Sequence, residues 1–258
     1  MSNQNEKAAS FRALHVPGQP LVLFNIWDPG SAKAVTEAGA KAIATGSWSV
    51  ANANNFADGE RIPLDLAIAN LARIVNSIDL PVTVDLESGY GADPEAVGHA
   101  VTRTIEAGAI GCNLEDSFPE SGKLRGIVDQ IARIEHARKA AVAAGIPYFI
   151  NARTDVFFQK PAAAHDISML AEALERASAY SNAGADCLFV PGLIDRALIA
   201  RLVEASPLPI NVMVGDNTPS RTALAQMGVV RVSHGPGPYL AMMNMLEQAA
   251  HAALRMEK

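Results

Sequence analysis

Eight short apolar runs alternate with amphipathic stretches along the whole 258-residue chain, and this alternation limits the possible folds more than any other feature. The runs PVTVDL, PYFINA and PINVMV are apolar at consecutive positions, which is typical of parallel strands buried on both faces. We expect strands at residues 21–27, 41–47, 81–87, 110–115, 147–153, 186–191, 209–214 and 229–234. The amphipathic stretches predict helices at residues 29–38, 63–78, 93–107, 127–144, 165–183, 195–205, 218–227 and 237–254.

A short repeat supports this count of units. The tripeptide Ala-Gly-Ala lies between a helix and the next strand at residues 38–40, 107–109 and 183–185, and Gly145 and Gly228 occupy equivalent places. Glycine there ends a helix in the left-handed conformation and turns the chain back into the sheet. Helix starts are marked by Asp28-Pro29, Asp93-Pro94 and Thr218-Pro219.

Eight such units predict a single (β/α)8 barrel domain over residues 1–258, with residues 1–10 as a flexible N-terminal tail. A doubly wound sheet is the main rival. No GxGxxG follows the first strand, and eight units exceed what that fold usually needs. Residues 48–62 and 116–126 are expected to be loops on the catalytic face.

Composition narrows the class of partner. The net charge of −6 and the pI near 5.5 argue against nucleic acid or an anionic membrane, which attract basic patches. No apolar run approaches the roughly 18 residues of a membrane span, and the polar start MSNQNEKAAS does not resemble a signal peptide. Cys112 and Cys187 have no metal-ligand spacing and indicate no disulfide framework. We therefore expect a cytoplasmic protein.

Two acidic pairs end adjacent predicted strands: Asp85 with Glu87, and Glu115 with Asp116. Side chains alternate along a strand, so Asp85 and Glu87 share one side, and Asn113 and Glu115 share another. Such carboxylates repel one another unless a cation lies among them. Because no His or Cys is near, Mg²⁺ or Mn²⁺ is favoured over zinc. Mg²⁺ keeps several waters, so we expect Asp85 as its one direct ligand, with Glu87, Glu115 and Asp58 holding waters.

Other polar residues gather at the same strand ends, where the active site of a barrel lies: Asn25, Asp28, Thr45, Gly46, Ser47, Asn151, Arg153, Asp155, Asn211, Ser233 and His234. Asp28 is interpreted as a helix cap. Arg153 is read as the only cation embedded in a strand, and it either forms a salt bridge to an acid or clamps a substrate carboxylate. The segment SHGPGP at residues 233–238 is either a phosphate-binding loop or a tight turn.

The segments VLFNIWDPGSAKAVTEAGAKAIATGS, PVTVDLESGYG, GCNLEDS and INARTD resemble, in this order and spacing, the isocitrate lyase and phosphoenolpyruvate mutase superfamily. The resemblance covers about residues 10–250. It implies a barrel whose last helix swaps onto a neighbouring subunit of a dimer or tetramer. It also implies Mg²⁺ and an α-oxo acid, or the enolate derived from one, as ligands.

The resemblance also assigns roles to residues. Thr45, Gly46 and Ser47 match a segment that cradles the substrate carboxylate with backbone N–H groups. Asp85 matches the metal ligand. The remaining matches are three acids that hold metal-bound waters and two substrate-binding positions: Asp58, Glu87 and Glu115, then Arg153 and Asn211.

The loop after the fourth strand departs from the family pattern. Isocitrate-type lyases carry a Lys-Lys/Arg-Cys-Gly-His segment there, whereas this chain has DSFPESGKLRG, which disfavours a cleavage that needs a cysteine acid. Lys123 can take the part of the mutase lysine, although Leu124 and Arg125 follow it. We expect residues 117–126 to be mobile and to close over a bound oxo acid.

The leading expectation is an Mg²⁺-dependent lyase that breaks a C–C bond next to an α-oxo carboxylate, as in decarboxylation of oxaloacetate or a relative. Arg153, Glu115 and Lys123 are its candidate catalytic residues. Two alternatives stay open. One is C–P chemistry, by a phosphoenolpyruvate mutase or a phosphonopyruvate hydrolase. The other is a non-catalytic barrel that senses an oxo acid.

Overall fold

Eight parallel strands form a ring in the computed structural model, which describes residues 2–255. Neighbours in the ring follow the order β1-β8-β7-β6-β5-β4-β3-β2, and one further parallel bridge, between Ile26 and Thr45, joins its two edges. The strands are β1 (Leu21–Leu23), β2 (Ile43–Ala44), β3 (Val82–Asp85), β4 (Gly111–Glu115), β5 (Phe149–Arg153), β6 (Cys187–Val190), β7 (Ile210–Met213) and β8 (Arg231–Ser233). The predicted (β/α)8 barrel is confirmed.

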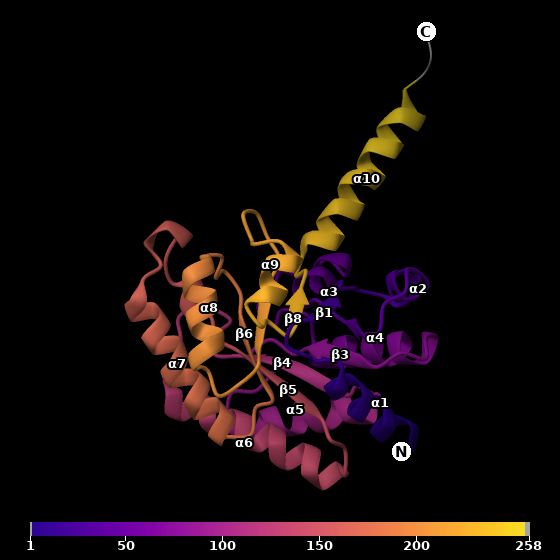
Figure 1. Cartoon of the computed structure of the whole chain (residues 1–258). Coiled ribbons are helices and arrows are strands. Elements are labelled where there is room, and N and C mark those ends of the chain that lie inside the picture. Colours follow the sequence, from indigo (N-terminus) through magenta and orange to yellow (C-terminus); the bar gives the residue numbers. More distant parts are fainter. Residues whose placement is uncertain (1, 256–258) are drawn as a thin grey trace.

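Helices surround the ring and follow the predicted order (Figure 1). Those expected from the amphipathic pattern are α2 (Pro29–Glu37), α4 (Leu64–Ser77), α5 (Pro94–Glu106), α6 (Ile127–Ala144), α7 (Ile167–Asn182), α8 (Arg196–Ala205), α9 (Arg221–Gln226) and α10 (Gly237–Leu254). The additional ones are α1 (Ser2–Ala13), α3 (Ser47–Ala53) and two short 3-10 turns, η1 (Val156–Phe158) and η2 (Ala162–Ala164). None of the helices in the described part of the chain has the length and apolar character to cross a bilayer.

The local signals act largely as predicted. All five glycines at helix ends have positive φ, between 67° and 101°: Gly39, Gly108, Gly145, Gly184 and Gly228. Asp28 and Asp93 accept hydrogen bonds from the backbone N–H of Ser31 and Ala96, so both are helix caps. The third predicted start is wrong, because α9 begins at Arg221 and is capped by Ser220 rather than by Thr218.

The N-terminal segment is not a flexible tail, because residues 2–13 form α1. Ala8 and Phe11 are completely buried. The ring of Phe11 packs edge-on against Phe149, which begins β5, with the two centroids 5.3 Å apart. Helix α1 therefore covers the barrel at the N-terminal ends of the strands. The burial of Ala8 and Phe11, three residues apart on one helix face, holds it there.

Two other regions differ from expectation. Residues 48–62 were expected to be a loop, but α3 occupies the start of this connection. At the other end of the chain, α10 projects away from the barrel (Figure 1). Several of its apolar side chains are exposed, with Leu240, Met245 and Leu246 between 50% and 63% accessible.

Candidate active site

A cavity of about 180 Å³ lies at the C-terminal ends of the strands. Its polar side chains come from strands β3, β4, β5 and β8 and from the segments that follow β1 and β2: Asn25, Ser47, Asp58, Asp85, Asn113, Arg153 and Ser233. The strand-end position is where barrels place their chemistry.

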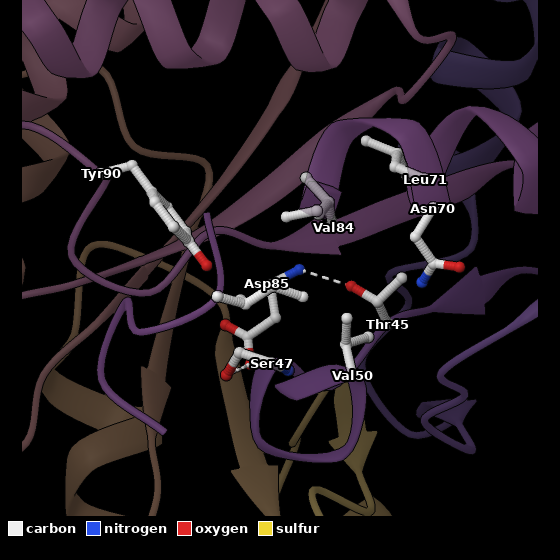
Figure 2. A pocket seen from close by; sticks show the side chains of 10 residues that line it. Thr45, Ser47, Val50, Asn70, Leu71, Val84, Asp85 and Tyr90 are labelled. Carbon is white, nitrogen blue, oxygen red and sulfur yellow. Dashed lines mark hydrogen bonds between the residues drawn. The ribbon is translucent and has the colours of Figure 1, made fainter. Parts of the chain in front are cut away.

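Asp85 ends β3 and turns toward Ser47, which begins α3 (Figure 2). One carboxylate oxygen, Oδ2, accepts from the Ser47 hydroxyl at 2.8 Å and from the Ser47 backbone N–H at 3.1 Å. The hydroxyl of Thr45 accepts from the Asp85 backbone N–H at 2.9 Å. The other carboxylate oxygen, Oδ1, is buried and has no hydrogen-bond partner within residues 2–255. Asp85 thus keeps one oxygen for a ligand.

Asp58 lines the same cavity as Asp85. Burial and the nearby Asp85 carboxylate together raise the pKa of Asp58 above its ordinary value. Two carboxylates that share one small cavity disfavour each other's charge, and a divalent cation relieves this repulsion. The hard oxygen donors present therefore fit a magnesium-type ion. Within residues 2–255, no three His, Cys, Asp or Glu side chains gather closely enough to form a metal cage by themselves.

Both carboxylate oxygens of Glu87 accept hydrogen bonds from the protein. Its Oε2 accepts from the backbone N–H groups of Gly59 and Glu60, at 2.9 and 2.7 Å, and its Oε1 accepts from the Tyr90 hydroxyl at 3.0 Å. Burial raises the pKa of Glu87 to about 7. The side chain therefore anchors the segment next to Asp58, and it positions that acid through the backbone.

The segments at residues 59–60 and 87–90 contact each other in both directions. Glu60 accepts from the Ser88 hydroxyl at 2.7 Å and from the Tyr90 backbone N–H at 2.8 Å. Glu60, Glu87 and Tyr90 all have positive φ, between 51° and 58°. Non-glycine residues rarely adopt this conformation, and each costs on the order of 1–3 kcal/mol. The paired carboxylate contacts hold these strained segments together.

Arg153 ends β5 between two acids. Its guanidinium contacts Glu115 Oε2 at 2.7 Å and both oxygens of Asp155, at 2.6 and 3.0 Å. Although burial opposes its charge, these two carboxylates raise the pKa of Arg153 above its ordinary value. Burial raises the pKa of Glu115 to about 8, against the opposing effect of Arg153. The salt-bridge alternative is therefore confirmed. Arg153 also lines the cavity, and its role as a clamp for a substrate carboxylate stays a prediction.

The backbone N–H groups of the expected cradle, Thr45, Gly46 and Ser47, already have acceptors within the protein. The N–H of Thr45 donates to Thr83 O and that of Gly46 donates to Ile26 O, because these residues close the strand ring. The N–H of Ser47 donates to Asp85. Gly46 and Ser47 still line the cavity. The next N–H groups of α3 are the ones that lack helical acceptors at this end of the helix.

Asn211 is completely buried in β7 and does not line the cavity. Its side chain exchanges hydrogen bonds with Ser233 at 3.2 Å. Ser233 also accepts from Arg231, a fully buried arginine of β8 that donates to Asn113 Oδ1 at 3.2 Å. Burial lowers the pKa of Arg231 to about 10. The reading of Arg153 as the only cation embedded in a strand is therefore wrong.

Arg231 is the polar residue beneath the cavity that sequence reasoning missed. Its signal is present in VVRVSH, where a cation alternates with valines at strand period and must face the barrel interior. Asn113 and Ser233 line the cavity and both contact Arg231. A positive charge thus lies directly below the site.

Residues 117–126 form a short turn closed by an antiparallel bridge between Ser117 and Leu124. Lys123 is exposed there and does not line the cavity. His234 is outside the cavity lining as well, since its ring packs against Phe24 with the centroids 5.1 Å apart. Gly235 has a φ of 54° and donates its backbone N–H to Asn25, so the SHGPGP segment begins as a tight turn.

Comparison with known proteins agrees with this geometry. Residues 11–254 match the family model of phosphoenolpyruvate phosphomutase. A solved putative phosphonomutase from Burkholderia cenocepacia is 57% identical, with a TM-score of 0.95 over 97% of this chain and 99% of that one. An uncharacterised protein of Mycobacterium tuberculosis is 36% identical over 95% of this chain and 87% of its own length. The 2-methylisocitrate lyase of Escherichia coli is 30% identical over 78% of this chain and 67% of its own length.

Members of this group include 2-methylisocitrate lyases, oxaloacetate decarboxylases and the phosphomutase itself. They are lyases and mutases, so this chain is an enzyme rather than a passive sensor of an oxo acid. The protein belongs to the isocitrate lyase and phosphoenolpyruvate mutase superfamily.

Proposed function

We propose that the protein is a Mg²⁺-dependent lyase of α-oxo carboxylates, with Mn²⁺ as an alternative ion. It breaks the C–C bond between the carbon adjacent to the oxo group and a departing carboxylate, as in oxaloacetate-type decarboxylation. One observation carries the proposal. The buried Asp85 Oδ1 lacks a hydrogen-bond partner within residues 2–255, in a cavity that Arg153 also lines. A cation on Asp85 and the guanidinium of Arg153 together suit a bidentate oxo acid.

The metal ligands follow from this geometry. Asp85 would bind the ion directly, and Asp58 would hold waters from the same cavity. Glu87 and Glu115 would support the metal site indirectly. Glu87 holds the segment beside Asp58, and Glu115 holds the guanidinium of Arg153. A bound divalent ion would polarise the oxo oxygen and stabilise negative charge that develops there.

The protein's own groups would orient the substrate. Arg153 binds the carboxylate, and Gly46 and Ser47 border it. The C–C bond to the departing carboxylate breaks, its electron pair moves toward the oxo oxygen, and CO₂ leaves without needing an acid. The carbon that remains then takes up a proton. Closure of residues 117–126 would bring Lys123 from its exposed position toward that carbon.

The projecting α10 supports an oligomer. A groove of about 1160 Å³ runs along β1 and α2 and is lined by apolar residues such as Leu21, Ile26 and Val35. Helix α10 leaves this face uncovered and carries its own exposed apolar residues outward (Figure 1). We propose that α10 docks in the corresponding groove of a second copy, in a dimer or tetramer. Removal of residues 239–258 should then yield monomers in light scattering.

C–P chemistry is the second candidate, because the Burkholderia cenocepacia protein, at 57% identity, is a putative phosphonomutase. The cavity favours C–C cleavage instead. A phosphonate keeps up to two negative charges throughout the reaction. Among the described residues that line the cavity, Arg153 is the one cation, and two carboxylates already neutralise it.

Pyruvate release from oxaloacetate and from phosphonopyruvate, each with and without Mg²⁺, tests the proposal. We expect release from oxaloacetate that depends on the metal, and at least tenfold slower release from phosphonopyruvate. The reverse order would establish C–P chemistry. Isomerisation of phosphonopyruvate to phosphoenolpyruvate, followed by ³¹P NMR, would identify a mutase.

A further inference from the structure

The cavity has two chemically different halves. The segments after β2 and the strands β3 and β4 contribute Asp58, Asp85 and Asn113 together with the ring of Trp48. Asn25 after β1 and Ser233 in β8 add two uncharged polar side chains. The next three units of the barrel contribute Phe158 after β5, Phe189 in β6 and Met213 in β7. Arg153 lies at the boundary, in register with Phe189 on the neighbouring strand.

The apolar half lines the cavity, and the guanidinium of Arg153 lies over one of its rings, 5.6 Å from the Phe158 centroid. Phe158 is 48% exposed, an unusual fraction for an aromatic side chain in a wall of a site. Phe189 is 4% exposed and Met213 is half-buried, so both lie deeper. An apolar group placed against these three side chains would remove apolar surface from water, which is favourable.

Positive charge is committed elsewhere. The three hydrogen bonds of Arg153 to Glu115 and Asp155 hold its guanidinium at the polar half. Arg125 turns away from the cavity, donating to Ser88 and Asp129. Lys123 is exposed outside the lining. The guanidinium of Arg153 lies 5.6 Å from the centroid of the Phe158 ring, but Glu115 and Asp155 already neutralise it. An anionic group at the apolar end would therefore compete with these two carboxylates for the one cation among the described residues that line the cavity, and its desolvation would be costly.

We propose that the substrate carries an uncharged, apolar substituent on the carbon next to its oxo group, and that this substituent packs against Phe158, Phe189 and Met213. The preferred substrate class is a 3-alkyl- or 3-aryl-substituted oxaloacetate, and oxaloacetate itself is a poorer substrate of the same site. This inference rests on the proposed function. The carboxylate that departs becomes neutral CO₂, so it needs no cation at this end. The product is an α-oxo acid with an apolar chain.

Binding of product-like oxo acids tests the inference directly. In Mg²⁺, we expect the affinity to rise from pyruvate to 2-oxobutanoate to 2-oxopentanoate by about fourfold for each methylene. A shape-matched pair isolates charge, since 5-methyl-2-oxohexanoate differs from 2-oxoglutarate by an isopropyl group in place of a carboxylate. The neutral member should bind at least tenfold more tightly, as measured by calorimetry.

Variants assign the effect to the apolar wall. Phe158→Ala should weaken 5-methyl-2-oxohexanoate several-fold, and Phe158→Leu should restore part of the loss. Phe158→Lys should shift the preference toward 2-oxoglutarate by at least tenfold. Ile167→Ala is the control, because Ile167 at the start of α7 is 50% exposed, close to the 48% of Phe158, and does not line the cavity.

Oxalate separates two kinds of failure, because it fills the polar half alone. If oxalate binds with Mg²⁺ but 2-oxoglutarate binds as tightly as its neutral match, the inference is wrong and the proposed function stands. Loss of that tight 2-oxoglutarate binding in Lys123→Ala would show that the closing loop supplies the cation, which also overturns the inference. If neither oxalate nor any oxo acid binds, the proposed function itself fails.

Discussion

The hydroxyl and the backbone N–H of Ser47 both donate to Oδ2 of Asp85, and Oδ1 of the same carboxylate stays buried without a hydrogen bond from any described residue. Two donors on one oxygen fix the direction of the other. A buried carboxylate oxygen without a partner is costly unless a ligand satisfies it. This asymmetry makes Asp85 the centre of the proposed site.

Arg153→Lys should reduce kcat/KM by roughly 100-fold or more, because an ammonium group cannot reproduce the forked contacts to Glu115 and Asp155 while also meeting a substrate carboxylate. Steady-state kinetics on oxaloacetate would measure the loss. Arg12→Lys, on the opposite face of the barrel and 46% exposed, is the control. An unchanged kcat/KM in Arg153→Lys would leave Arg153 a structural ion pair only.

Glu87→Gln should flatten the pH dependence of stability in the metal-free protein. The folded state holds a proton on Glu87 up to a pKa of about 7, whereas the unfolded chain releases it above about 4.5. The unfolded state therefore binds fewer protons between these values, and this group makes the free energy of unfolding fall as pH rises from about 4.5 to about 7. The expected fall from pH 5 to pH 7 is roughly 2 kcal/mol.

Urea unfolding at several pH values in EDTA would measure this slope. The difference between wild type and Glu87→Gln should be largest between pH 5 and pH 7. Glu135→Gln, a change on the exposed face of α6, should leave the slope as it is. Equal slopes for wild type and Glu87→Gln would contradict the raised pKa.

Gly111→Ala should destabilise the barrel by about 1–3 kcal/mol or more. A Cβ at this position in β4 would lie 2.5 Å from the backbone oxygen of Phe149, the residue paired with it in β5. Because the strand backbones in the ring cannot shift independently, relieving this clash would distort the hydrogen bonds between β4 and β5 and lower stability. Gly237→Ala, where a Cβ would meet nothing within 4 Å, should change stability by less than about 1 kcal/mol. Equal denaturation midpoints for the two variants would contradict this account of the close strand approach.

The strands and helices were predictable because burial imposes a period that the sequence displays. PVTVDL and PINVMV read as buried strands, and each lies in the ring, although the observed strands are shorter than the apolar runs. The runs continue past the hydrogen-bonded ring into the loops. Helix α1 was missed because SNQNEKAASFRA is mostly polar, and only Ala8 and Phe11 reach the core.

The site was predictable in its residues and less so in their contacts. Strand-end position brought Asp85 and Arg153 to one cavity, and Asp58, which the family resemblance indicated, joins them from the connection after β2. The sequence could not show that the Glu87 carboxylate would bond to the N–H groups of Gly59 and Glu60, because those contacts depend on positive φ in segments 27 residues apart. The sequence also could not show that the backbone N–H groups of Thr45 and Gly46 would donate to carbonyl oxygens of the closing strand ring.

Oxalate with Mg²⁺ should protect the peptide bond after Lys123 from trypsin, whereas Mg²⁺ alone should not. Lys123 is exposed in a turn that its own backbone hydrogen bonds close, and Gln159 outside the turn donates to Gly122 O at 3.0 Å. Closure over a bound oxo acid would bury the bond. Digestion followed by mass spectrometry gives the rate, and cleavage after the exposed Lys41 is the internal control. Equal rates after Lys123 in both conditions would exclude a gating loop.

Calorimetric titration of oxalate into wild type and Asp85→Ala, each with and without Mg²⁺, tests the central claim most directly. Wild type should bind oxalate only when Mg²⁺ is present. Asp85→Ala should lose that binding, by at least 100-fold, while its circular dichroism spectrum and thermal midpoint stay close to those of wild type. Tight Mg²⁺-dependent binding of oxalate by a folded Asp85→Ala protein would contradict the assignment of the metal, and with it the proposed enzyme.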